Sequence, residues 1–119
     1  MKSKPAHELN KNDLSEISRK WLRKLKINPN RIQIMKMKNK WGSCSTKGNI
    51  TLNSDLTLLP KEVAEYAVLH ELLHFMVPNH GKTFKALLSA HMPNWEERHQ
   101  KLLSLSHSYV LEKNRGNDR

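Results

Sequence analysis

The 119-residue chain has a single cysteine, Cys44, and no long apolar run. One cysteine excludes an intramolecular disulfide and fits a reducing compartment, where Cys44 is expected to pack as a small side chain. No stretch approaches the roughly 18 apolar residues of a membrane span, and residues 1–10 lack the hydrophobic segment of a signal peptide. These absences predict a soluble, cytoplasmic protein without a membrane segment.

Acidic residues are scarce in the first 48 positions, which hold 13 Lys and Arg against 3 Asp and Glu. Residues 49–119 hold 8 of each kind, so the net charge of +10 arises entirely before residue 49. Such a basic segment favours contact with nucleic acid, or else it is a solvated face that keeps the protein soluble. The aromatic side chains there that could stack on bases are only Trp21 and Trp41.

The segment His70–His74 reads HELLH. Two histidines four residues apart project from the same side of a helix, so both imidazoles can reach one metal ion. Glu71 lies about 60° to 100° around the helix from them and can face the ion without binding it. The chain contains seven histidines and eight glutamates, so this bare pattern is only moderately specific.

The residues around this motif, 61–77, predict one buried helix. Pro60 suits its first turn, and Pro78 stops it. Glu62 and Glu65 lie near its positive N-terminal end. Apolar residues occupy nearly all of the remaining circumference, which is typical of a buried helix. Histidines and a glutamate inside such a helix need polar partners, and a metal ion provides one.

A third histidine follows where the chain breaks at Pro78-Asn79. The break lets the chain double back ahead of a second helix, residues 82–90, so we expect His80 to be the third metal ligand. Three protein ligands leave the fourth tetrahedral position to water, as in a catalytic zinc site. The competing third ligands are His91, His99, Glu96 and Glu97, which their distance in sequence does not exclude. Zinc would then activate the water, with Glu71 as general base.

The remaining patterns predict a single α+β domain over residues 1–119. A helix is expected at about residues 13–26, with its capping pattern at 12–16, and a last helix at 94–111. Extended segments at 31–38, 41–45 and 50–53 predict a small, mostly antiparallel sheet. Residues 1–11 and 113–119 are expected to be disordered.

Several short motifs follow one another in a fixed order: KWGSCS at 40–45, GNITLN at 48–53, Pro60, YAVLHELLH at 66–74, Asn79-His80 and Phe84. Together they resemble the YgjP-like family of zinc metallopeptidase domains, and the series is far more specific than HELLH alone. The chain departs from the family pattern at Lys40, where Arg is usual, and at Lys85, where Trp is usual.

The resemblance implies a compact zincin-like domain with a small mixed sheet over the active-site helix. One Zn²⁺ would be held by His70, His74 and His80, and the substrate would be a protein or peptide. The chain is similar, more distantly, to SprT-like proteases, which act on DNA-bound proteins. It is also similar to minigluzincin peptidases, some of which are inhibited by a terminal segment, here the chain after Tyr109.

Two other functions stay open. YgjP-like proteins have been linked to hydrolysis of nucleoside triphosphates, which would place phosphates near Lys40, Lys47 or Arg98. A nucleic-acid-binding module with a structural metal site is the other alternative, based on basic residues 1–48.

The sequence also offers candidates for substrate contacts. The strand 48–53 is expected to be a sheet edge on which an extended peptide pairs, through Asn49, Ile50 and Thr51. Trp41 and Ser43, just before it, are further candidates for substrate binding, as are His91 and Arg98. Candidates for stabilising the oxyanion are His91, Arg98, His99, Tyr66 and Tyr109.

Overall fold

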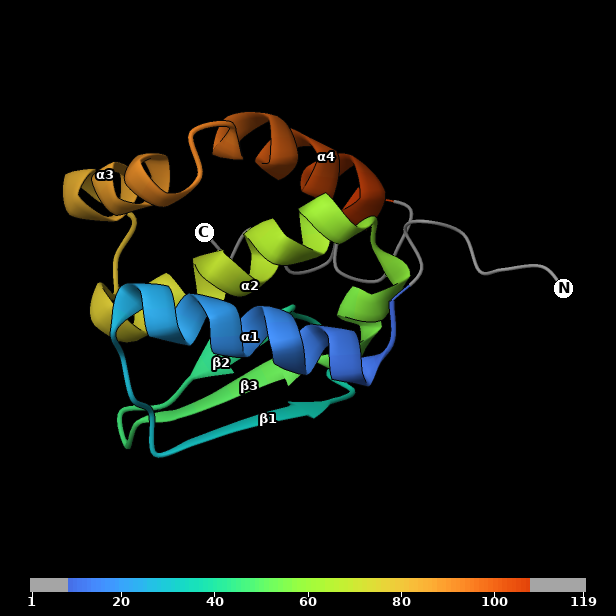
Figure 1. Ribbon diagram of the computed structural model, residues 1–119. Coiled ribbons are helices and arrows are strands. Elements are labelled where there is room, and N and C mark those ends of the chain that lie inside the picture. The colour runs from blue at the N-terminus through green and yellow to red at the C-terminus, as the bar shows by residue number, and fades with distance from the viewer. Residues whose placement is uncertain (1–8, 108–119) are drawn as a thin grey trace, which may run out of the picture.

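The computed structural model describes residues 9–107. Its elements are α1 (Lys11–Leu25), β1 (Arg31–Met35), β2 (Gly42–Cys44), β3 (Asn49–Asn53), the 3-10 helix η1 (Ser54–Leu58), α2 (Lys61–Met76), α3 (Lys82–His91) and α4 (Trp95–His107) (Figure 1). The predicted α+β class is confirmed. The ends expected to be disordered, 1–8 and 113–119, lie outside the described residues, as do positions 108–111 of the predicted last helix.

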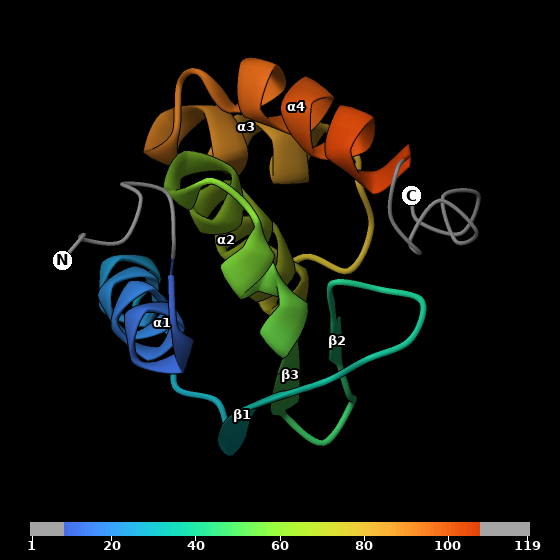
Figure 2. The ribbon, with the colours of Figure 1, turned by 90° about the vertical axis from the view of Figure 1, so that its right-hand side faces the viewer.

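Helix α2 lies at the centre of three layers. Figures 1 and 2 show α1 and α2 over one face of the sheet, and α3 and α4 beyond α2 on the side away from the strands. Helix α2 contacts α1, α3, α4 and the strands β2 and β3, and most of its residues are buried. The prediction of a buried helix over this segment is therefore confirmed. Among residues 9–107, no helix is long and apolar enough to cross a membrane.

The sheet has the strand order β1-β3-β2, with β3 in the centre. Strand β2 pairs with β3 antiparallel, whereas β1 pairs with β3 parallel. The prediction of a mostly antiparallel sheet is wrong for β1, because residue alternation identifies the buried face of a strand but not its direction. In the observed register Ile32 lies beside Ile50, and Ile34 lies beside Leu52. All four belong to the core or pack against it.

Helix α1 begins earlier than predicted. The Asn10 side chain accepts a hydrogen bond from the Asp13 backbone N–H, and the Asp13 carboxylate accepts one from the Asn10 backbone N–H. This reciprocal pair is a capping box, two residues before the expected one. Lys11 is therefore helical, and the expected N-terminal disorder does not reach it. At the other end, Lys26 has φ 58° and terminates the helix.

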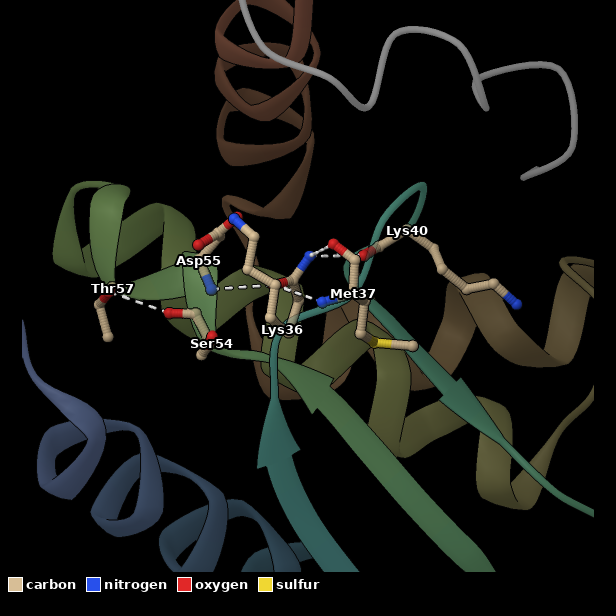
Figure 3. A network of polar contacts seen from close by, with 7 residues as sticks. Lys36, Met37, Lys40, Ser54, Asp55 and Thr57 are labelled. Atoms are coloured by element: carbon tan, nitrogen blue, oxygen red, sulfur yellow. Dashed lines mark hydrogen bonds and ion pairs between the residues drawn. The ribbon is translucent and has the colours of Figure 1, made fainter.

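Asn53 ties the connection between β1 and β2 to the end of β3. Its buried amide donates to the carbonyl oxygens of Met37 and Lys40, at 3.3 and 2.8 Å, and its oxygen accepts from the Asp55 N–H at 2.9 Å. Figure 3 shows this network, in which Asp55 also pairs with Lys36. The network holds the backbone of the segment before β2 at Lys40, next to Trp41.

Candidate metal centre and active site

The ring nitrogens of three histidines converge at the C-terminal half of α2. His70 and His74 are one helical turn apart on α2, and His80 enters from the turn before α3. The Nε2 atom of His80 lies 2.9 Å from Nε2 of His74 and 3.2 Å from Nε2 of His70. Among the described residues, these three form the one group of His, Cys, Asp or Glu whose ligand atoms cluster in this way.

The donor set fits a tetrahedral metal ion. Ligand nitrogens at zinc distances of 2.0–2.1 Å are about 3.3 Å from one another in a tetrahedron, close to the spacing of these Nε2 atoms. The Nδ1 atom of His74 lies 3.3 Å from the Val77 carbonyl oxygen. Because a carbonyl only accepts, Nδ1 carries the hydrogen and leaves the Nε2 lone pair directed at the cluster.

Phe84 packs against all three imidazoles. Its ring centre lies 5.2 Å from that of His70, 4.7 Å from that of His74 and 4.9 Å from that of His80. The Phe84 side chain is 2% exposed, so α3 provides an apolar base for the histidine cluster. An apolar surround of this kind limits solvent access to a metal site.

Glu71 is 8% exposed and lies directly against strand β2. A Cβ atom on Gly42 would come within 2.7 Å of Glu71 Cγ and 3.0 Å of Glu71 Cδ. The Cys44 thiol donates to the Glu71 carbonyl oxygen at 3.3 Å. Strand β2 therefore holds both the side chain and the backbone of Glu71, and the Glu71 carboxylate needs a glycine at position 42.

Gly42→Ala is expected to lower the free energy of unfolding by about 1–3 kcal/mol, because the added methyl overpacks a closed site. In a Glu71→Ala background, Cγ and Cδ are absent, and of the three nearest contacts of the added methyl only that with the Thr51 carbonyl oxygen, at 3.0 Å, remains. The loss caused by Gly42→Ala should then shrink by about 1 kcal/mol or more. Denaturant unfolding of the four proteins measures this coupling.

Ser43→Ala is the matched control for that cycle. Successive side chains of a strand alternate between its faces, so Ser43 points away from α2. It should show no coupling to Glu71→Ala. An equal loss from Gly42→Ala in both backgrounds would show that Gly42 does not act through the Glu71 side chain.

Cys44 remains a packing residue, as the sequence indicates. Burial, with a further contribution from the negative charge of Glu71, raises the pKa of the Cys44 thiol to about 12. The thiol is therefore protonated at neutral pH, and it is not a member of the histidine cluster.

A cavity of about 590 Å³ opens beside the histidine cluster. Residues on five segments line it: the connection before β2, α2, the turn that carries His80, α3 and α4. The side chains of His70, Glu71 and His80 form part of its wall. The volume lies within the range of natural ligand pockets, so a substrate in this cavity would lie directly at the cluster.

Two of the predicted oxyanion-stabilising candidates reach this cavity. The Tyr66 hydroxyl lies 2.8 Å from His99 Nδ1, and both side chains line the cavity wall. Tyr66 precedes His70 by one helical turn, and their rings lie 5.7 Å apart. The other described candidates, His91 and Arg98, do not line the cavity. Tyr109 lies outside the described residues.

The predicted third ligand His80 is brought to the cluster, and its competitors are not. The His91 ring packs edge-on against Trp21 with ring centres 6.0 Å apart. His99 is engaged with Tyr66. Glu96 and Glu97 are exposed on the first turn of α4.

The prediction that strand 48–53 forms a sheet edge is wrong. Strand β3 is the central strand, so its backbone is paired on both sides and cannot accept a further strand. Ile50 is fully buried, and none of Asn49, Ile50, Thr51 and Ser43 lines the cavity. Arg98 lies elsewhere too, where it donates to the Glu62 carbonyl oxygen at 3.1 Å. Of the predicted substrate contacts, only Trp41 lies at the cavity.

Comparison with known proteins bears directly on the function of this site. The model of the YgjP-like metallopeptidase domain matches residues 4–105. The chain belongs to the YgjP-like metallopeptidase family. The resemblance inferred from the sequence motifs is therefore confirmed, and the protein is a metallopeptidase with a histidine triad suited to a metal ion. A search of curated proteins found no match.

Two of the solved structures that are similar to this YgjP-like chain are metallopeptidase zymogens. The crystal structure of the metallopeptidase zymogen jannalysin from Methanocaldococcus jannaschii matches with a TM-score of 0.68 and 31% identity. That match covers 77% of this chain and 95% of jannalysin. The metallopeptidase zymogen abylysin from Pyrococcus abyssi shares the fold, with a TM-score of 0.66, 21% identity and coverage of 76% and 92%. The predicted zincin-like architecture and the likeness to minigluzincins are thus confirmed.

Proposed function

We propose that this metallopeptidase binds one Zn²⁺ through His70, His74 and His80 and hydrolyses peptide bonds in proteins or peptides. The convergence of three imidazole Nε2 atoms beside the Glu71 carboxylate carries the proposal. Three neutral nitrogen ligands suit zinc and leave one tetrahedral position for water. A bound zinc ion supplies a water of lowered pKa and polarises the scissile carbonyl.

Glu71 is the general base in this proposal. Its Oε2 atom lies 3.8 Å from Nδ1 of His70, and its side chain lines the cavity in which a substrate would bind. In the proposed reaction, Glu71 takes a proton from the attacking water and passes it to the leaving amine. Its close contact with Gly42 holds the carboxylate in place and keeps bulk water from one side of it.

Metal removal and restoration test this proposal. Purified protein should contain one zinc per chain and should cleave a denatured protein substrate. Chelation should abolish cleavage, and added Zn²⁺, but not Mg²⁺, should restore it, because Mg²⁺ prefers oxygen ligands. Full cleavage by protein shown to be free of metal would contradict the proposal.

A nucleotide substrate has less support. Of the three cations predicted to contact phosphates, only Lys40 lines the cavity. Lys47 lies in the turn between β2 and β3, and the Arg98 side chain donates to the Glu62 carbonyl oxygen in the first turn of α2. Nucleic-acid binding by residues 1–48 stays a prediction, with Lys20 and Lys36 already engaged in ion pairs with Glu65 and Asp55.

Jannalysin was crystallised as a zymogen. The expectation that the chain after Tyr109 inhibits this enzyme concerns residues outside the described range. It therefore rests on similarity to that relative.

A further inference from the structure

The cavity beside the histidine cluster presents mainly carbon surface. Trp41, Trp95, Leu88 and Leu103 are among the side chains that line it. The Trp41 indole donates to the Ser106 hydroxyl at 3.4 Å, and the Trp95 indole donates to the Ser89 hydroxyl at 3.0 Å. Because each indole N–H is satisfied within the protein, both rings are held in place and offer their apolar faces to an occupant.

Two lysines are the only charged side chains on the described wall of this cavity, apart from Glu71 and the histidines. Lys40 lies before β2, and Lys85 lies on α3. Figure 3 shows the Lys40 side chain extending away from the Asn53 network that holds its backbone. Neither lysine forms an ion pair with the described residues, in contrast to Lys20 and Lys36.

We propose that this cavity is a substrate subsite for a bulky apolar side chain next to the scissile bond, and that Lys40 and Lys85 select an acidic residue beside it. The inference rests on the proposed peptidase function and adds the class of peptide. An apolar occupant matches the leucine and tryptophan walls, and an anion complements the two lysines. Both lysines are exposed, so their contribution is selectivity more than affinity.

The direct test measures the binding of short peptides to the Glu71→Gln protein. Tryptophan fluorescence reports the binding, because Trp41 and Trp95 line the cavity. The peptides are otherwise identical. One position carries either Leu or Ser, and the neighbouring position carries either Asp or Lys. Leu should bind about 10- to 100-fold more tightly than Ser. Asp should be favoured over Lys by about 2- to 5-fold for each lysine engaged.

Leu103→Ser is a suitable wall variant, since Leu103 is 42% exposed and its replacement leaves the core intact. It should reduce the preference for the Leu peptide several-fold. Leu58→Ser is its matched control, because Leu58 is 64% exposed on η1 and does not line the cavity. The control should bind both peptides like the wild type.

Lys40→Glu combined with Lys85→Glu should invert the preference from Asp to Lys peptides. Lys47→Glu, an exposed charge reversal outside the cavity, should leave the preference unchanged. An unchanged preference in the double variant would overturn the role of the lysines, and equal binding of Leu and Ser peptides would overturn the subsite. Displacement of bound peptide by a nucleotide at lower concentration than by a second peptide would also overturn it.

Hydrolysis by the wild type separates this inference from the proposed function. Cleavage of all peptides at similar kcat/KM would contradict the subsite and leave the peptidase function intact. Selective binding without cleavage of any peptide by the zinc-loaded wild type would support the subsite and contradict the peptidase function.

Discussion

Glu71→Gln is expected to lower kcat for peptide hydrolysis by about 10²- to 10⁴-fold, the contribution of a positioned general base. The amide has almost the same shape as the carboxylate, so contact with Gly42 is retained while proton transfer is lost. The three histidines are untouched, and bound zinc should remain at one ion per chain. Steady-state kinetics together with metal analysis of the same sample measures both effects.

Glu65→Gln is the matched control for this substitution. Glu65 lies on the same helix, forms an ion pair with Lys20 at 2.7 Å, and does not line the cavity. Its replacement should change kcat by less than a factor of about two, whatever its small effect on stability. A Glu71→Gln protein as active as the wild type would exclude Glu71 as the general base.

His80→Ala is expected to weaken zinc binding by more than about 100-fold. Loss of residues that merely orient a ligand already costs about 10- to 100-fold, and His80 is predicted to be a ligand itself. Hydrolysis should fall in parallel at limiting zinc. The metal-dependent rise in melting temperature seen for the wild type should also shrink, because that stabilisation depends on the ratio of free zinc to Kd.

His99→Ala tests His80 against the one competing ligand that also lines the cavity. His99 lines the same cavity but is engaged with Tyr66, so zinc affinity should stay within a few-fold of the wild type. Zinc retained in His80→Ala and lost in His99→Ala would reverse the assignment. A competition titration with a chromophoric chelator measures both affinities on the same scale.

The central helix could be predicted from sequence because its determinants are local. Pro60 and Pro78 delimit it, and the spacing of His70 and His74 fixes a common side of the helix. The return of His80 followed from the break before α3. These are the parts of the site for which neighbouring residues determine the geometry.

The sheet could not be predicted to the same extent because its pairing is not local. The pattern of β1 identifies Ile32 and Ile34 as inward-facing, but not a parallel partner nearly 20 residues later. The expected edge strand proved to be central, since β1 covers the side of β3 that β2 leaves free. Substrate contacts assigned to Asn49, Ile50 and Thr51 depended on that edge.

The cavity wall was also beyond sequence reasoning. Lys85 and Leu103 lie on different helices and come to line one cavity only because α3 and α4 both pack against α2. The glycine in the KWGSCS motif was a sequence signal for the close approach of Gly42 to Glu71. The reason for that glycine is the Glu71 side chain lying against the strand, which only the fold shows.

X-ray absorption at the zinc edge of the purified wild-type protein tests the proposed metal centre most directly. The spectrum should fit three imidazole nitrogens at 2.0–2.1 Å and one oxygen from water, with no sulfur. In His80→Ala, any remaining zinc should show one imidazole fewer. A sulfur ligand near 2.3 Å, or four protein ligands that leave no position for water, would contradict a catalytic site formed by His70, His74 and His80.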